Sequence, residues 1–135
     1  CVGIVGRGNV GSRLQTLLEA MDVPTLACDP PLAERGEPGL VPLAEALAEK
    51  PDAAFICNPN ALHVPVALEC VRAGVPVLME KPLASDLAGI DQLLAEGKDR
   101  FIIDFQKERI SLLSSAFQRI NANSSSGLSN SCSFK

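Results

Sequence analysis

Three glycines near the start of the chain have a spacing that suits the binding of a phosphate group. They follow an apolar run and precede an amphipathic stretch, in the order Gly6-Arg7-Gly8-Asn9-Val10-Gly11. In such a G-x-G-x-x-G pattern the first glycine permits a tight turn, the second lets the backbone approach a pyrophosphate, and the third lets a helix pack closely on a sheet. The N-terminus of that helix favours an anion. A turn without a ligand is the alternative. The predicted pyrophosphate-binding residues of a dinucleotide site are Gly6, Gly8, Asn9, Val10 and Gly11.

An acidic residue ends the second apolar run, where it could reach the ribose of the same dinucleotide. A carboxylate at Asp29 can accept hydrogen bonds from ribose hydroxyls and would repel a 2′-phosphate, so it favours NAD over NADP as the cofactor. A solvated loop aspartate in front of two prolines is the alternative interpretation. Arg7 and Arg35 oppose the assignment, since either guanidinium could reach a phosphate if the following loop folds back.

The runs around these residues alternate between short β-rich segments and amphipathic helical patterns. Strands are predicted at 2–5, 25–28, 53–57, 75–79 and 101–105. Helices are predicted at 9–20 and 43–50, from about 61 to Gly74, from Ser85 to Gly97, and through Ile110, Leu113, Phe117 and Ile120. The first helix is expected to bury an apolar face formed by Val10, Leu14, Leu17, Leu18 and Met21. The alternation predicts an α/β fold, a Rossmann-type doubly wound parallel sheet with helices on both faces.

The length and composition of the chain point to one globular domain. The chain has 135 residues, of which 47% are hydrophobic and 21% are charged. This length does not accommodate a dinucleotide-binding domain together with a C-terminal substrate domain. We assign 1–121 to the dinucleotide-binding Rossmann domain and 122–135, which is mostly Ser, Asn and Gly, to a disordered tail. The start without Met suggests a fragment of a longer protein.

Charge and cysteine content exclude several classes of function. The net charge of −4 and the pI of about 4.9 do not suit a nucleic-acid surface. No apolar run approaches the roughly 20 residues of a membrane span. The five cysteines are odd in number and form no C-x-x-C pair, so neither a disulfide framework nor a metal site is predicted. We expect a reducing, cytoplasmic compartment.

Two segments in the second half of the chain are similar to a known family of oxidoreductases. They are Asn58-Pro59-Asn60-Ala61-Leu62-His63 and the stretch 73–84, which contains Glu80-Lys81-Pro82. Both resemble the Gfo/Idh/MocA family, in which an x-P-N-x-x-H stretch follows the third strand and an E-K-P stretch follows the fourth. Phe105-Gln106-Lys107-Glu108-Arg109 is similar to the end of the family's next strand, and the resemblance covers about 2–120.

The resemblance implies roles for these residues at the carboxyl ends of the strands, where parallel sheets bind ligands. It places Pro59 and Asn60 beside the nicotinamide of the cofactor. Asn58 and Glu80 would contact the cofactor as well. It makes Lys81 the catalytic residue, which binds the substrate and handles its proton, whereas an ordinary surface lysine is the alternative. His63 either contacts the cofactor or has a capping or packing role. The Lys81–Pro82 bond could be cis.

The first half of the chain resembles a different family. The stretches 2–15 and 25–37 are similar to erythronate-4-phosphate dehydrogenases, which belong to the D-2-hydroxyacid dehydrogenases. The catalytic Arg, Glu and His of that family have no counterpart after Ala53, so the E-K-P segment decides the predicted chemistry. Both resemblances imply hydride transfer with NAD.

These observations lead to one preferred function and two alternatives. The preferred function is the cofactor-binding domain of an NAD-dependent dehydrogenase that acts on a small-molecule substrate: a sugar, a polyol or a related hydroxy compound. The alternatives are the nucleotide-binding segment of a D-2-hydroxyacid dehydrogenase and a catalytically silent NAD-binding module. No nucleic-acid or membrane partner is predicted, and the full-length parent could form a homo-oligomer. We expect this chain to bind NAD without turning over a substrate on its own.

Overall fold

The computed structural model describes residues 1–97 and 101–103, and its framework is a parallel β-sheet. Five strands lie in the order β2-β1-β3-β4-β5, and every neighbouring pair is parallel. The strands are β1 (Val2–Val5), β2 (Thr25–Cys28), β3 (Ala53–Ile56), β4 (Val77–Met79) and β5 (Phe101–Ile103). The predicted Rossmann-type α/β fold is confirmed.

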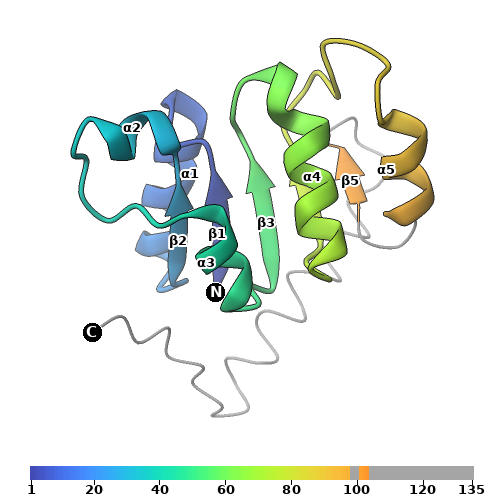
Figure 1. The fold of residues 1–135 in the computed structure, drawn as a ribbon. Helices are drawn as coiled ribbons and strands as arrows, with labels where there is room; N and C mark the ends of the chain where they lie inside the picture. Colours follow the sequence, from blue (N-terminus) through green and yellow to red (C-terminus); the bar gives the residue numbers. More distant parts are fainter. Residues whose placement is uncertain (98–100, 104–135) are drawn as a thin grey trace, which may run out of the picture. The chain divides into compact units, whose positions relative to one another are not determined.

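Helices cover both faces of this sheet. The helical segments are α1 (Asn9–Ala20), α2 (Pro30–Glu34), α3 (Leu43–Ala48), η1 (Asn60–Leu62), α4 (His63–Arg72) and α5 (Ile90–Glu96). In Figure 1, α1 lies behind the sheet, and α3 and α4 lie in front of it. The chain passes from β1 to β2 on one side and then returns past β1 to β3 on the other side. The direction of winding therefore reverses at β1, which is what makes the sheet doubly wound.

The observed strands match the predicted ones closely, with differences at their ends. β1 and β2 have the predicted bounds, whereas β3 ends at Ile56 rather than at Cys57, and β4 begins at Val77 rather than at Val75. The N–H of Val75 donates to the carbonyl of Cys70 at 2.9 Å, so this residue closes the turn after α4 and does not pair with a strand. β5 is described only as far as Ile103, and its predicted continuation lies outside the described residues.

α1 has its predicted bounds, but it buries only part of the predicted apolar face: Leu18 is buried and Leu14 is half-buried. Its buried residues are Gly11 and Leu18. Three residues of the predicted apolar face are instead exposed, at 47%, 62% and 57% of their surface: Val10, Leu17 and Met21. The rotation of the helix is set by Gly11, where a Cβ would overlap the carbonyl oxygen of Gly6 and lie 3.3 Å from Ile4. For these three residues the prediction was wrong because it counted apolar residues and ignored this close approach of helix and sheet.

A short helix after β2 lies where a loop was expected. Asp29 is its N-cap, and the carboxylate oxygen Oδ1 accepts a hydrogen bond from the N–H of Leu32 at 3.2 Å. The prolines that follow Asp29 occupy the first helical positions, which lack intrahelical acceptors for an N–H in any case. The sequence Asp29-Pro30-Pro31 is therefore a helix start, and its interpretation as a loop alone was wrong.

The helix predicted from Ser85 begins only at Ile90. The Asp86 carboxylate accepts a hydrogen bond from the N–H of Ala88 at 2.8 Å, which closes a local turn. Gly89 then has a φ of +76°, a left-handed conformation that interrupts any helix. Leu87, which lies within the predicted helix, is 87% exposed.

The core that supports the second half of the sheet lies between β3, β4 and the helices α4 and α5. Alternate residues of the two strands point into it, and they are Ala54, Ile56, Val77 and Met79. Leu93 of α5 is completely buried in the same cluster. Burial of these side chains fixes β3 and β4 relative to α4, and so fixes the loops that follow the two strands.

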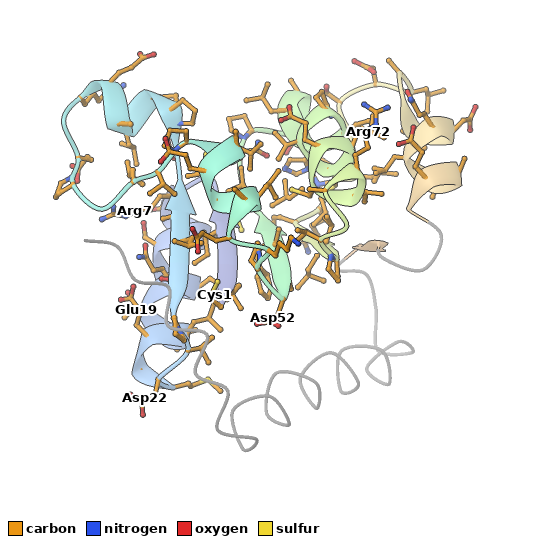
Figure 2. The ribbon with its side chains drawn as sticks, turned by 60° about the horizontal axis from the view of Figure 1, so that its bottom comes forward. Cys1, Arg7, Glu19, Asp22, Asp52 and Arg72 are labelled. Atoms are coloured by element: carbon orange, nitrogen blue, oxygen red, sulfur yellow. The ribbon has the colours of Figure 1, made fainter. Side chains whose placement is uncertain are left out.

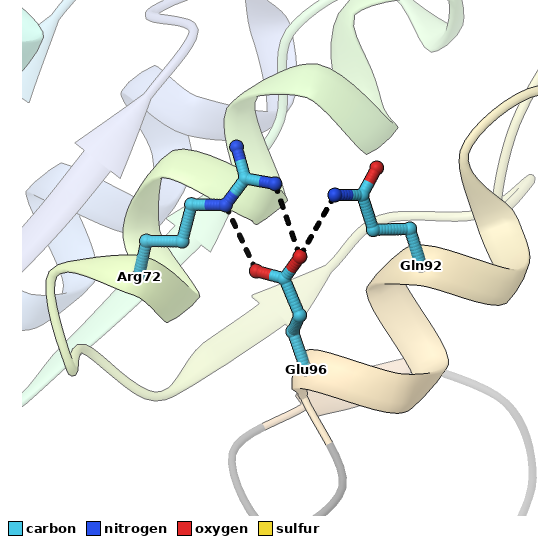
Figure 3. A network of polar contacts seen from close by, with 3 residues as sticks. All are labelled: Arg72, Gln92 and Glu96. Atoms are coloured by element: carbon cyan, nitrogen blue, oxygen red, sulfur yellow. Dashed lines mark hydrogen bonds and ion pairs between the residues drawn. The ribbon is translucent and has the colours of Figure 1, made fainter.

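At the surface, α4 and α5 are joined by a group of charged and polar side chains (Figure 3). Arg72 donates from Nε and Nη2 to the two carboxylate oxygens of Glu96, at 2.8 and 3.0 Å, and Gln92 donates to the same carboxylate at 2.8 Å. The hydrogen bonds from Arg72 and then Gln92 hold the pKa of Glu96 below its ordinary value. The pair is exposed, so it orients the two helices more than it stabilises the fold.

Two expectations fall on parts of the chain that are not described: the helix through 110–120 and the tail at 122–135. None of the helices in the described ranges is both long enough and apolar enough to cross a lipid bilayer.

Candidate functional site

The turn between β1 and α1 is built from two glycines that have no room for a side chain. Gly6 follows β1 with a φ of +93°, and its N–H donates to the carbonyl of Cys28 at 2.8 Å. A Cβ on Gly6 would lie 2.6 Å from the Cα of Asn58, and a Cβ on Gly11 would overlap the carbonyl oxygen of Gly6. Both glycines are therefore required by packing alone.

Gly8, the middle glycine, has a different environment. It precedes the first residue of α1 with a φ of −74°, and a Cβ built on it would meet nothing within 4 Å. The carbonyl of Gly8 accepts the N–H of Ser12 at 2.9 Å, and no side chain caps the first turn of α1. The N-terminus of α1 therefore has N–H groups that no side chain caps, and the space beside Gly8 is empty of protein atoms. Such a helix N-terminus attracts a negatively charged group.

Asp29, at the carboxyl end of β2, is tied to this turn. Its Oδ2 accepts the backbone N–H of Arg7 at 2.7 Å, while Oδ1 accepts the N–H of Leu32. Each carboxylate oxygen has a second lone pair, so the group can still accept hydrogen bonds from a ligand. The side chain of Arg7, labelled in Figure 2, donates from Nη1 to the carbonyl of Pro38 at 2.9 Å. The sequence did not predict the bond between Asp29 and Arg7, which depends on the turn geometry.

Asn58 lies where the winding of the sheet reverses, between the carboxyl ends of β1 and β3. Ligands of doubly wound sheets bind in the crevice at this point. The backbone of Asn58 packs against Gly6. Among the buried side-chain nitrogen and oxygen atoms of the described residues, the Oδ1 of Asn58 is the one that has no hydrogen-bond partner. An unpaired buried acceptor costs roughly 1–3 kcal/mol, so this oxygen is suited to an N–H or O–H of a ligand.

The loop after β4 is attached to the loop after β3. The N–H of Glu80 donates to the carbonyl of Ile56 at 2.9 Å. The Lys81–Pro82 bond is cis, as anticipated. His63 is 1% exposed, and its two ring nitrogens lie 2.9 Å from the carbonyl oxygen of Pro82 and 2.8 Å from that of Asn58. These contacts bring the Asn58 and Pro82 loops to one edge of the sheet, as the sequence predicted.

Most of the other predicted site residues lie on the surface of these loops. Pro59 is the N-cap of η1 and is exposed, as are Asn60 and Lys81, while Glu80 is half-buried. The two contacts of His63 occupy both ring nitrogens, so a direct contact with the cofactor through them would require breaking one. Both contacts join residues that meet only in the folded chain, and no sequence pattern could have shown them.

The cysteines near the site do not form a reactive centre. Burial, and then the Glu80 carboxylate, raise the pKa of Cys57 to about 11. Burial is also the main cause of the raised pKa values of Cys28 and of Cys70, the latter to about 12. These thiols are protonated at neutral pH and are poor nucleophiles. Within the described ranges, no group of three or more His, Cys, Asp or Glu side chains is placed to hold a metal ion.

Comparison with known proteins identifies the family of the chain. The model of the family described as "Oxidoreductase family, NAD-binding Rossmann fold" (GFO_IDH_MocA) matches residues 11–101. A shorter match joins the chain to the erythronate-4-phosphate dehydrogenase of Klebsiella pneumoniae, with 52% identity over 58 residues. That match covers 43% of this chain and only 15% of the relative.

Solved structures of the family have the same fold. The WlbA dehydrogenase of Chromobacterium violaceum, in complex with NADH and UDP-GlcNAcA, is 26% identical with a TM-score of 0.64, over 87% of this chain and 39% of that one. UDP-N-acetylglucosamine 3-dehydrogenase from Acidithiobacillus ferrooxidans is 26% identical with a TM-score of 0.59, over 73% and 35%. GenD2 from gentamicin A biosynthesis, in complex with NAD, is 28% identical with a TM-score of 0.59, over 76% and 32%.

This chain thus spans less than half the length of each of these relatives. The family match covers most of the described residues, from Gly11, the last glycine of the turn, through the loop at Lys81. The match to erythronate-4-phosphate dehydrogenase is local, and the D-2-hydroxyacid alternative is not favoured. The chain belongs to the Gfo/Idh/MocA family of oxidoreductases and is an NAD-binding Rossmann domain of that family.

Proposed function

We propose that this domain serves an oxidoreductase that uses NAD to oxidise or reduce a sugar, a polyol or a related hydroxy compound. One observation carries the proposal: of the three glycines in the turn, Gly6 and Gly11 are enclosed by the protein, whereas Gly8 faces open space. A pyrophosphate above Gly8 explains why a side chain is absent from a position that has room for one. The three solved relatives described above are dehydrogenases of sugar nucleotides or are complexes with NAD.

The adenosine and pyrophosphate half of NAD would bind on the β1 and β2 side of the crevice. Backbone N–H groups of the first turn of α1 would hold the pyrophosphate, and this assigns binding to Gly6, Gly8, Asn9, Val10 and Gly11. Asp29 would accept hydrogen bonds from the ribose hydroxyls through its remaining lone pairs. Its negative charge would repel the 2′-phosphate of NADP, and the Arg7 guanidinium is held at Pro38.

The nicotinamide half would lie over the loops that follow β3 and β4. The unpaired Oδ1 of Asn58 suits an N–H or O–H donor, and Pro59, Asn60 and Glu80 would line the same side. When bound, NAD supplies or accepts the hydride. We assign to Lys81 the contact with the substrate oxygen, where Nζ would take up the hydroxyl proton during oxidation and return it during reduction.

The test of the cofactor assignment is a titration of the chain with NADH and, separately, with NADPH. The chain contains no Trp and no Tyr, so the fluorescence of the nicotinamide can be followed without competing protein emission. We expect NADH to bind at least about tenfold more tightly than NADPH, since a charge-assisted hydrogen bond contributes about 1.5–3 kcal/mol. Equal affinities would refute the role of Asp29, and an absence of NADH binding would refute the proposed function.

The role of Lys81 requires an assay of turnover with NAD and a panel of sugars and polyols, in a protein that joins this domain to a substrate domain, because we expect this chain alone to turn over no substrate. Lys81→Met should lower kcat by roughly 10²–10⁴-fold, because it removes the group that moves the proton. The affinity for NADH should change little. A variant that retains its turnover, or that loses NADH affinity instead, would show that Lys81 does not handle the proton.

The remaining proposals concern the protein as a whole. The chain covers 32–39% of the length of the three solved relatives, so the substrate and the compartment of the whole protein are proposals. We propose a small-molecule substrate and a reducing, cytoplasmic compartment. The four cysteines of the described residues are free thiols, which supports the latter.

A further inference from the structure

His63 is unlike the other side chains of the core. It is the first residue of α4, and its side chain is 1% exposed. Among the described residues, it is the one polar or charged residue that is buried. Burial of a polar ring is unfavourable unless hydrogen bonds replace those made to water. Each ring nitrogen of His63 lies within hydrogen-bond distance of a backbone carbonyl oxygen.

The two contacts of the ring lead to different loops. Nε2 lies 2.8 Å from the carbonyl oxygen of Asn58, directly after β3, and Nδ1 lies 2.9 Å from the carbonyl oxygen of Pro82, after β4. Carbonyl oxygens only accept, so each contact becomes a hydrogen bond when the ring nitrogen carries hydrogen. A neutral ring donates to one of the two carbonyls and an imidazolium donates to both, and in every form the ring fills the space between them.

Other contacts also support the loop after β4 in the described structure. The N–H of Glu80 donates to the carbonyl of Ile56, which continues the pairing of the sheet, and Leu83 and Ala84 pack against the core. The His63 ring adds the link that lies between the Asn58 carbonyl and the Pro82 carbonyl. The spacing of these two carbonyls therefore depends on the ring.

We propose that His63 is a positioning residue, which sets the spacing of the two loops that receive the nicotinamide half of NAD. Both ring nitrogens contact backbone carbonyls, those of Asn58 and Pro82, so the ring acts through these loops and not on the cofactor. This inference rests on the proposed function. It adds that the two halves of the cofactor site use different hydrogen bonds, because Asp29 accepts from Arg7 and Leu32 whereas the His63 ring contacts the carbonyls of Asn58 and Pro82.

The proposal makes a selective prediction about affinity. ADP-ribose contains the adenosine, the pyrophosphate and one further ribose, but it lacks the nicotinamide. His63→Leu keeps a buried side chain of similar size and removes both ring nitrogens, and with them every hydrogen bond to the two carbonyls. We expect it to weaken NADH binding by about tenfold, equal to about 1.4 kcal/mol, and to change the affinity for ADP-ribose by less than about threefold.

Two amide variants separate the two contacts. The side-chain nitrogen of His63→Asn can take the place of Nδ1, and that of His63→Gln can take the place of Nε2, so each keeps one of the bonds. Both should fall between the wild type and His63→Leu in NADH affinity. Leu93→Ala is the matched control, because it opens the same core on α5 without touching either loop. It should lower the melting temperature and leave the ratio of NADH to ADP-ribose affinity unchanged.

Each outcome of this experiment decides between the hypotheses. If the wild type binds neither NADH nor ADP-ribose, the proposed function fails first. If the wild type binds both and His63→Leu binds NADH equally well, the positioning role is refuted and the proposed function stands. A parallel loss of both ligands also refutes it, since His63 would then support the fold in general. Should His63→Leu not fold, the amide variants carry the test, and failure of all three to fold would make His63 a core residue only.

Discussion

Replacing Gly8 and Gly11 separately by alanine should divide cofactor binding from folding. The two glycines belong to one sequence pattern, yet their surroundings are opposite. An added Cβ at Gly8 meets nothing within 4 Å, whereas one at Gly11 overlaps the carbonyl oxygen of Gly6 and lies 3.3 Å from Ile4. One methyl group should therefore act on the ligand at the first position and on the protein at the second.

The effects on stability can be estimated from these distances. At Gly8 the φ of −74° suits alanine, which restricts the unfolded chain and gains about 0.4–1 kcal/mol. Alanine is a poorer N-cap than glycine by a similar amount, so Gly8→Ala should change the free energy of unfolding by less than about 1 kcal/mol. Gly11→Ala must push α1 away from the sheet, and overpacking of this severity should cost about 3 kcal/mol or more.

The assay combines thermal unfolding, followed by circular dichroism, with the NADH fluorescence titration. Gly8→Ala should melt within about 5 °C of the wild type. It should bind NADH at least about tenfold more weakly, a loss of about 1.4 kcal/mol. Gly11→Ala should show the larger drop in melting temperature. If Gly8→Ala binds NADH as the wild type does, no pyrophosphate lies above Gly8, and the observation on which the proposed function depends has another cause.

Three further predictions follow from the charges and thiols of the domain. Asp29→Asn should reduce the preference for NADH over NADPH by about tenfold, whereas Asp86→Asn, which removes the same charge from a loop elsewhere, should leave the preference unchanged in parallel titrations. The hydrogen bonds from Arg72 lower the pKa of Glu96. They therefore stabilise the fold at a pH above the ordinary pKa of a glutamate, and this stabilisation is lost as the pH falls through the lowered pKa. Melting curves of Glu96→Gln and the wild type should therefore converge in acid, and a constant difference would contradict this assignment. The pKa of Cys57 is about 11, whereas that of an ordinary thiol is 9.0, so at pH 8 the thiolate fraction of Cys57 is about a hundredfold lower than that of an ordinary thiol. Its labelling by iodoacetamide, followed by mass spectrometry, should therefore be slower than that of an ordinary exposed thiol by at least this factor.

The strands and the end of the sheet that carries the site were predictable from the sequence. Short β-rich runs bounded by glycines and prolines mark strands, and the alternation with helices requires a parallel sheet. Because parallel strands end at the same edge, Gly6, Asp29, Asn58 and Lys81 were all expected along one edge of the sheet. This is why the site could be outlined before its geometry was known.

Other features depend on contacts that the sequence does not encode locally. The buried face of α1 is decided by the approach of Gly11 to Gly6, so the exposed Leu17 could not be placed by counting apolar residues. The late start of α5 depends on a left-handed Gly89. His63 and Pro82 are 19 residues apart in the chain, and the contact between the ring and the Pro82 carbonyl depends on the pairing of β3 with β4.

The two backbone bonds to Asp29 also constrain how the cofactor preference of such a domain could evolve. The carboxylate that would exclude NADP also receives the N–H of Arg7 and begins α2 at Leu32. Alanine at position 29 would admit a 2′-phosphate. It would also remove the acceptor for the N–H groups of Arg7 and Leu32 and so weaken the turn between β1 and α1. Asparagine or serine removes the charge and keeps a side-chain oxygen for the helix N-terminus. A lineage that moves from NAD to NADP should therefore pass through one of these residues at position 29, and laboratory selections for NADP use should recover them before alanine or glycine.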